Sequence, residues 1–359
     1  MLLSTSLKTV LLLGVQEVLS SPTPELRTAE CSTKYQRKSW TALTSDEKSE
    51  YIQAELCLMS APAQSGVPGA ITRWDELQYS HIAQASYIHG VGAFLPFHRY
   101  YMTVHESLMR TECGYTGPMA YWDEAGDIGN LLTSDIFDLE LGFGGNGTAS
   151  GRCISDGPFV NLTLHYNEDL TVTDYCVSRN INERSFSGAD QANVDSCLAE
   201  STFLETWNCL EGRPHGAGHG GVSGTMINPL LSPGDPIFFL HHTYLDKLWW
   251  EWQSQDLSQR LTEIGGNNTR QRFGGGGPPG FFDLEFPGEE DQVFPPGNGS
   301  GFPGGGLDQA PNPAFVDYFN DGGNTTTLNH TLWSANILVN ATIADVMDIG
   351  GSFICAEYV

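Results

Sequence analysis

Basic side chains are scarce in this sequence of 359 residues: Lys and Arg number 17 against 43 Asp and Glu, which leaves a formal net charge of −26. Such a surface repels nucleic-acid phosphates and anionic lipid headgroups. Long apolar runs are also missing, since no stretch of the sequence approaches the ~20 apolar residues that a membrane-spanning helix needs. The sequence therefore predicts neither a nucleic-acid partner nor a membrane partner.

Sequence motifs for some common metal and redox sites are missing too. None of the eight cysteines has the Cys-x-x-Cys spacing of a redox or zinc site. His215 and His219 lie four residues apart, but Gly216 stands where a zinc protease has its general-base glutamate. The His-Glu-x-x-His mechanism of those enzymes is therefore excluded.

What the sequence does contain is typical of a globular protein. Hydrophobic residues make up 40% of the chain and aromatic residues 11%, enough for a sizeable core, while a charged fraction of 17% argues against disorder. No shift in composition divides the chain, so we expect a single domain over residues 21–359. Within it, residues 270–313 are dominated by Gly and Pro and are expected to form a long loop.

Residues 1–20 have the pattern of a secretory signal peptide. Lys8 precedes a short apolar run over residues 10–15, and the small residues Ser20 and Ser21 follow. Eight cysteines and seven Asn-x-Ser/Thr sequons are also typical of a secreted glycoprotein with disulfides, with buried free thiols as the alternative for the cysteines. The sequons begin at Asn146, Asn161, Asn267, Asn298, Asn324, Asn329 and Asn340.

Apolar periodicity predicts three helices in the first third of the chain, over residues 45–58, 71–88 and 96–110. Gly90 and Gly92 interrupt the pattern between the last two, which allows the chain to turn there. Residues 125–195 are rich in Gly, Asn, Asp and Ser and predict surface loops with short strands. Alternation around residues 331–339 predicts a further strand, and Cys355 is expected to tie the end of the chain to the body.

Two separated clusters of histidines are the most informative feature of the sequence. Neutral imidazole suits copper, zinc, iron or nickel, and two groups of three could hold two ions side by side. No nearby carboxylate pattern accompanies them, which disfavours di-iron and di-manganese sites and favours copper. The candidate ligands of this binuclear site are His81, His89 and His98 in one group and His215, His219 and His242 in the other.

The second group combines two different sequence contexts. His215 and His219 would face the same way on a helix, although the glycines between them make a poor helix. His242 lies in the dense apolar run over residues 235–253, which predicts a buried helix. Three further histidines lack any such context and are expected to be surface or core residues: His105, His165 and His330.

The chain resembles the type-3 copper proteins, which comprise tyrosinases, catechol oxidases and haemocyanins. The resemblance rests on residues 94–101 and 235–253 and extends roughly from Cys31 to Gln253. It implies a mainly α fold, in which a four-helix bundle holds a binuclear copper site, with long loops and a few short strands. It also implies that one copper ion is bound by His81, His89 and His98, and the other by His215, His219 and His242.

The resemblance also implies roles for residues beside the ligands. Glu211 matches a glutamate that holds a water near the second copper ion in the family, and it is the candidate catalytic residue. The Asn that assists this glutamate in other members is replaced by Gly216, which predicts weak or no monophenol hydroxylation. His241 would pack or hydrogen-bond beside the site. Candidates for a scaffold that orients the ligands, or alternatively for simple buried ion pairs, are Arg99, Asp123 and Asp246.

The implied function is that of a secreted oxidase with two copper ions as cofactors and a small phenol and dioxygen as substrates. It would convert ortho-diphenols, or ortho-aminophenols, to ortho-quinones. A full tyrosinase with monophenolase activity and a haemocyanin-like oxygen-binding protein would use the same six ligands and are the alternatives. A catalytically silent relative is disfavoured because all six ligand positions are histidine.

Overall fold

The computed structural model describes residue 31 and residues 33–148, 152–271 and 319–359. The predicted signal peptide and all but the first two residues of the 270–313 loop lie outside the described residues. Among the described residues, no helix has both the length and the apolar character needed to cross a bilayer.

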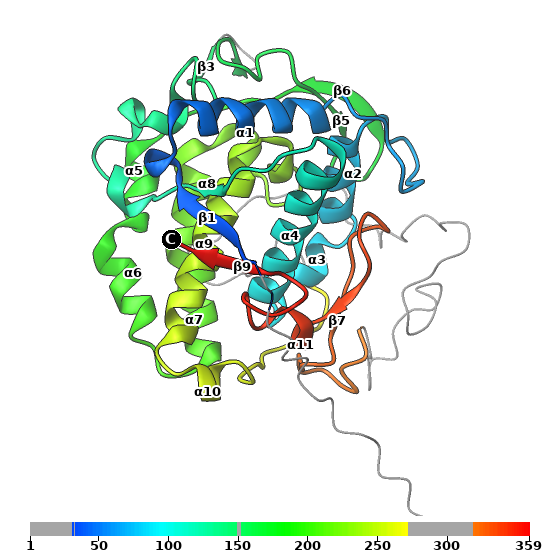
Figure 1. The fold of residues 1–359 in the computed structure, drawn as a ribbon, viewed down its shortest axis with the longest axis vertical. Coiled ribbons are helices and arrows are strands. Elements are labelled where there is room, and N and C mark those ends of the chain that lie inside the picture. The colour runs from blue at the N-terminus through cyan, green and yellow to red at the C-terminus, as the bar shows by residue number, and fades with distance from the viewer. Residues whose placement is uncertain (1–30, 32, 149–151, 272–318) are drawn as a thin grey trace, which may run out of the picture.

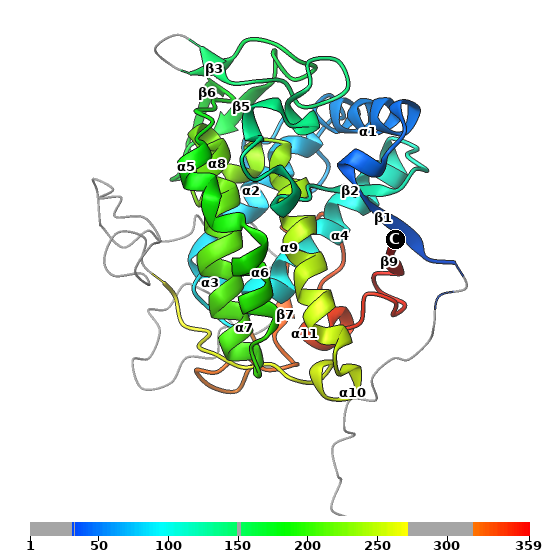
Figure 2. The same ribbon diagram turned by 90° about the vertical axis from the view of Figure 1, so that its left-hand side faces the viewer.

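Helices form most of the regular structure and pack together at the centre of the molecule (Figures 1 and 2). Helix α9 packs lengthwise against α4 and also contacts α6 and α7. The predicted mainly α fold with a helical core is confirmed. The helices are α1 (Ser45–Leu58), α2 (Arg73–Ile82), α3 (Ala85–Ile88), α4 (Phe94–Glu112), α5 (Glu183–Phe186), α6 (Gln191–Leu198), α7 (Phe203–Leu210), α8 (Gly216–Val222), α9 (Ile237–Ser254), α10 (Leu257–Arg260) and α11 (Ile343–Val346).

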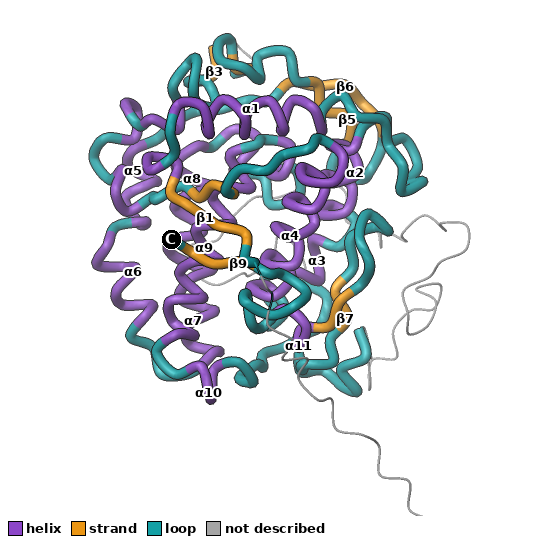
Figure 3. Tube along the Cα trace, viewed as in Figure 1, coloured by secondary structure: helices purple, strands orange, loops and turns teal. Residues whose placement is uncertain are grey.

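The strands are short and lie around this helical core (Figure 3). One parallel sheet has the order β2-β1-β9 and so joins the first and last strands of the chain. Three two-stranded ladders, β3-β4, β5-β6 and β7-β8, complete the set. The strands are β1 (Tyr35–Ser39), β2 (Met119–Tyr121), β3 (Gly147–Thr148), β4 (Cys153–Ile154), β5 (Thr163–Tyr166), β6 (Val172–Cys176), β7 (Thr331–Leu332), β8 (Ala341–Thr342) and β9 (Ala356–Tyr358).

The helix predicted over residues 71–88 is in fact two helices. The first, α2, begins at Arg73 after a capping box made by Thr72 and Asp75. It ends at Ile82, and α3 follows as a separate helix. A continuous helix would hold His81 and His89 about 12 Å apart along its axis, at 1.5 Å per residue. The break brings their ring centroids to 5.0 Å. The prediction of one helix was wrong because periodicity does not reveal a requirement for two side chains to converge.

Two other predictions also need correction. The strand predicted around residues 331–339 is limited to Thr331–Leu332, because Ala335 and Asn336 have positive φ angles that leave the extended conformation. Residues 125–195 do form loops with short strands, but the segment also contains α5 and most of α6. Local composition does not report the tertiary contacts that stabilise such short helices.

All eight cysteines are paired, so disulfides, and not free thiols, are the correct interpretation. Cys355 bonds to Cys31 and closes the chain near both ends of the described residues, as predicted for Cys355. The other pairs are Cys57–Cys113, Cys153–Cys176 and Cys197–Cys209.

A buried network of charges joins the parallel sheet to the two longest helices. Arg37 on β1 donates to Asp246 Oδ2 on α9 at 2.8 Å and to Glu106 Oε2 on α4 at 3.3 Å. Arg99 on α4 donates to Asp246 Oδ1, and the Tyr358 hydroxyl on β9 donates to Asp246 Oδ2 at 2.6 Å. Asp246 on α9 therefore accepts hydrogen bonds from β1, α4 and β9.

Replacing Asp246 by alanine should destabilise the protein by about 3–5 kcal/mol, because the buried Arg99 guanidinium then loses its carboxylate partner and Arg37 keeps only Glu106. Denaturant unfolding measures this loss. Glu251→Ala is the matched control on the same helix, since Glu251 pairs with Lys247 near the surface and should contribute less than about 1 kcal/mol. Equal losses in the two variants would show that the network is not a structural centre.

Candidate metal centre

The first group of histidines converges from three elements. His81 lies in the last turn of α2, His89 directly after α3, and His98 in the first turns of α4. Their ring centroids are 5.0, 5.2 and 5.7 Å apart, and each side chain is buried. One ring nitrogen from each lies within 4.8 Å of the others, so the three can share one metal ion.

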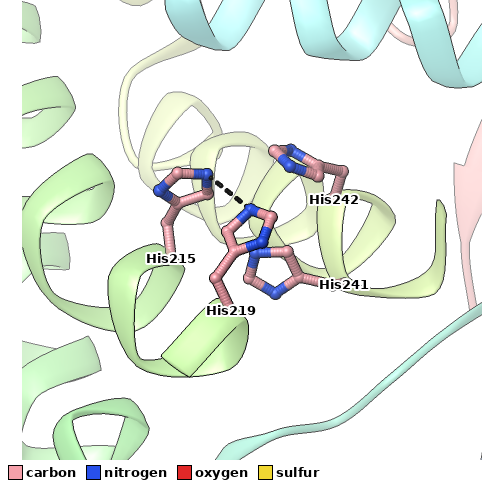
Figure 4. A group of neighbouring side chains, drawn as sticks. All are labelled: His215, His219, His241 and His242. Carbon is pink, nitrogen blue, oxygen red and sulfur yellow. Dashed lines mark hydrogen bonds between the residues drawn. The ribbon is translucent and has the colours of Figure 1, made fainter. Parts of the chain in front are cut away.

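The second group contains four histidines (Figure 4). His215 ends the helical turn between α7 and α8, His219 lies on α8, and His241 and His242 are neighbours on α9. One ring nitrogen from each of the four lies within 4.8 Å of the rest. His241, which the sequence predicts beside the site, is thus a member of this group.

A wide helical turn over Glu211–His215 connects α7 to α8 and contains Pro214. Proline has no N–H to donate along the helix, and insertions of this kind are frequent at functional sites. His215 and His219 therefore lie on one nearly continuous helical segment despite the glycines between them. Their Nε2 atoms are 3.1 Å apart.

Backbone carbonyls orient five of the six predicted ligands. In each of these rings Nδ1 lies at hydrogen-bond distance from a carbonyl oxygen, which leaves Nε2 as the lone-pair donor for a metal. The sixth ring, His242, has no partner at either nitrogen among the described residues. The pairs are His81 with Leu230 at 3.2 Å, His89 with Ala85 at 3.0 Å, His98 with Phe94 at 2.8 Å, His215 with Glu211 at 3.1 Å and His219 with Met226 at 2.6 Å.

The donor set fits a pair of metal ions. Burial lowers the pKa of all six imidazoles, that of His89 to about 4, so the rings are neutral and able to coordinate at neutral pH. The Nε2 atoms of His81, His98 and His242 are buried and have no hydrogen-bond partner within the described part of the chain. Such atoms are costly in a core unless something coordinates them.

The two groups adjoin each other directly. The rings of His98 and His242, one from each group, stack with centroids 4.2 Å apart and planes 12° from parallel. Phe94 touches both groups, with its centroid 4.7 Å from His98 and 4.8 Å from His215. Phe238 lies 4.1 Å from His242. Two ions held here would be close together and bordered by aromatic rings.

Glu211 connects the two groups. Its Oε1 accepts the Gly90 N–H at 2.7 Å, and its Oε2 accepts the indole N–H of Trp207 at 2.6 Å. Burial raises the pKa of Glu211 to about 7, against the lowering effect of these two hydrogen bonds. Because Gly90 follows His89 and the Glu211 carbonyl faces His215, the residue joins the loop of the first group to the helix of the second.

Glu124 is a residue near the site that sequence reasoning missed. It is fully buried, and its Oε1 is hydrogen-bonded to Nδ1 of His241. Burial raises the pKa of Glu124 well above the usual range and lowers that of His241 to about 3. The only signal in the sequence is weak: two acidic residues, Asp123 and Glu124, are adjacent. The residue proposed from the sequence as part of the scaffold is Asp123, and its side chain is exposed.

The other scaffold candidates do not orient the ligands. Arg99 and Asp246 bond to each other and to the charge network, and Arg99 also donates to the carbonyls of Val346 and Met347. The alternative interpretation, a buried ion pair, is the correct one for both. The three isolated histidines also have carboxylate partners away from the site: His105 with Glu55, His165 with Asp174 and His330 with Asp321.

Comparisons with known proteins agree with this geometry. Residues 71–255, just over half of the chain, match the family described as the common central domain of tyrosinase. A tyrosinase-like protein of Diaporthe leptostromiformis is 33% identical over 264 residues, which cover 70% of this chain and 66% of the relative. A tyrosinase of Aspergillus flavus is 34% identical over 252 residues, which cover 66% and 69%. The chain thus spans about two thirds of the length of these relatives.

The fold is shared with a solved structure as well. A mutant polyphenol oxidase of Thermothelomyces thermophila aligns with a TM-score of 0.70 at 22% identity, over 91% of this chain and 89% of that one. The resemblance inferred from the sequence is confirmed. With its matching central domain, its relatives and its paired histidine groups, the chain belongs to the tyrosinase family of type-3 copper proteins.

Proposed function

We propose that this protein uses dioxygen to oxidise ortho-diphenols to ortho-quinones, or ortho-aminophenols to the corresponding quinone imines, with weak or no hydroxylation of monophenols. The observation that carries the proposal is the pair of adjoining histidine groups, joined by the stacked rings of His98 and His242. Two diphenols would supply the four electrons and four protons that reduce one dioxygen to two waters. The two copper ions would be held by His81, His89 and His98 and by His215, His219 and His242.

Bound copper would supply the electron transfer between phenol and dioxygen, and the protein supplies geometry and a dry site. The carbonyl partners fix five of the rings, so that little reorganisation is needed when metal binds. Phe94 and Phe238 would help to exclude water, since their rings pack against His98 and His242. Glu211 is the group that could hold a water to accept the phenol proton, since each of its carboxylate oxygens retains acceptor capacity.

Weak monophenolase activity follows from the residue after His215. Gly216 is half-buried at the start of α8 and has no side chain with which to help Glu211 hold that water. An ortho-diphenol gives up its protons more easily than a monophenol. Diphenol oxidation therefore depends less on this assistance.

We also propose that the protein is secreted and glycosylated. Four disulfides support this, because such bonds persist in oxidising compartments. The six sequon asparagines within the described residues are all exposed, at positions 146, 161, 267, 324, 329 and 340.

The ligand assignment predicts that His98→Ala and His242→Ala each remove at least one of two copper ions per chain. Loss of partners outside the ligand shell commonly weakens metal binding 10–100-fold, so loss of a ligand should cost more than about 100-fold in oxidase rate. Elemental analysis and oxygen uptake measure the two effects. His165→Ala, which changes a histidine bonded to Asp174, should keep both ions. Full copper content in either ligand variant would refute the assignment.

Oxygen uptake by the copper-loaded protein on catechol, ortho-aminophenol and tyrosine tests the proposed reaction. Rapid uptake is expected with catechol or the aminophenol and slow or lagging uptake with tyrosine. Equal rates on tyrosine and catechol would identify a full tyrosinase. Reversible oxygen binding with no turnover above that of free copper would identify an oxygen carrier.

Gly216→Asn should raise the rate on tyrosine relative to catechol by about fivefold. One added hydrogen bond to the water at Glu211 contributes about 1 kcal/mol, which corresponds to that factor. The ratio of the two initial rates is the measurement, and Gly212→Asn, at an exposed glycine in the preceding turn, is the control. An unchanged ratio would show that this position does not limit monophenol hydroxylation.

A further inference from the structure

The proposed ligand set leaves one member of the second histidine group without a role. His241 lies on α9 directly before His242, is 1% exposed, and places a ring nitrogen within 4.8 Å of those of His215, His219 and His242. Its Nδ1 is held by Glu124, which is completely buried, and its Nε2 has no partner within the described residues. A buried carboxylate and imidazole this close to a metal site need a physical explanation.

The His241 ring contacts all three proposed ligands of the second copper ion. It meets the His219 ring edge-on, with centroids 4.5 Å apart and planes at 73°. It lies 5.3 Å from His215 with planes 26° from parallel, and 4.8 Å from His242 with planes at 77°. Figure 4 shows these four rings gathered at the junction of α8 and α9. A shift of the His241 ring would therefore disturb the whole second group.

The backbone of α8 is shaped to accept this pair. A Cβ atom added at Gly218 would overlap the His241 ring and would lie 2.7 Å from Glu124 Oε1. Any other residue at position 218 would thus force the pair or the helix to move. His219, a proposed ligand, is the next residue. α8 can approach α9 closely beside His219 because Gly218 has no side chain.

The orientation of the His242 ring depends on its neighbours. The final torsion angle of a histidine ring is broad, so a ring is fixed only by hydrogen bonds and packing. His242 has no hydrogen-bond partner at either nitrogen among the described residues, and packing alone holds it. The neighbouring ring, His241, is held by its hydrogen bond to Glu124. Carboxylates commonly orient histidines that bind a metal directly. Here the same kind of bond orients a ring that packs against the three proposed ligands.

We infer that Glu124 and His241 form a positioning pair that sets the copper affinity of the second site. The pair acts on His215, His219 and His242 through ring packing and does not itself replace a ligand. This inference rests on the proposed function, because it assumes that those three histidines bind copper. It predicts that the two copper sites respond differently to loss of the pair.

The test compares Glu124→Ala with Glu124→Gln in the copper-loaded full chain. Alanine releases the His241 ring and should weaken second-site copper 10–100-fold, whereas glutamine can still bond to Nδ1 and should restore most of the affinity. Chelator titration measures both sites, and the His98→Ala background isolates copper in the second one. The electron paramagnetic resonance spectrum of that single Cu(II) should change in Glu124→Ala and return towards the parent in Glu124→Gln.

Glu55→Ala is the matched control. Glu55 and His105 form a second buried carboxylate–imidazole pair, 3.1 Å apart, packed against Phe239 and two helical turns along α4 from His98. Its loss should lower stability but leave both copper affinities and the spectrum unchanged. If Glu124→Ala does not fold, His241→Phe keeps a ring in place without the hydrogen bond and should also weaken the second site.

Three results would overturn the inference: unchanged second-site affinity in Glu124→Ala, the same weakening in Glu55→Ala, or a glutamine variant no better than the alanine variant. Failure of the proposed function gives a different result. In that case the parent protein itself would not hold two copper ions per chain. Two tightly bound ions in the parent, with no response to Glu124→Ala, would refute the positioning role alone.

Discussion

The structure depends on keeping neutral imidazole nitrogens buried and available for coordination. A buried polar nitrogen without a partner is costly. Each imidazole must therefore keep one nitrogen for a metal ion while hydrogen bonds at the other nitrogen hold the ring in place. Backbone carbonyls meet this requirement at Nδ1 of five rings, from residues as far apart in sequence as Ala85 and Leu230. Much of the fold can be understood as the means of bringing those carbonyls to those rings.

A charge network and a disulfide stabilise the scaffold around the histidines. Asp246 joins β1, α4, α9 and β9 through buried charged hydrogen bonds, and Cys31–Cys355 closes the chain beside the same sheet. Asp246 also joins the two helices that carry His98 and His242, through its bond to Arg99. The charge network and the proposed metal ligands are therefore different residues on the same two helices, which explains why charged residues near a ligand in sequence need not orient it.

Carboxylates occupy two positions next to the histidines, and they differ in what they reach. Glu211 bridges the loop after His89 and the helix that carries His215. Glu124 reaches only the second group, through His241. The surroundings of the two groups thus differ: backbone carbonyls lie at Nδ1 of each ring in the first, while carbonyls and a carboxylate–imidazole pair surround the second. Equivalent ligands in a binuclear site do not imply equivalent environments.

The sequence by itself determined the six candidate ligands, the helical segments that carry most of them and the family, because histidine spacing and apolar periodicity are local properties. It could not determine the break after Ile82 or the role of Glu124. Each depends on contacts between residues distant in sequence: His81 with His89 across a turn, and Glu124 with His241 across more than a hundred residues. Which carboxylate faces a buried ring is decided by how helices pack, and only the tertiary structure contains that information.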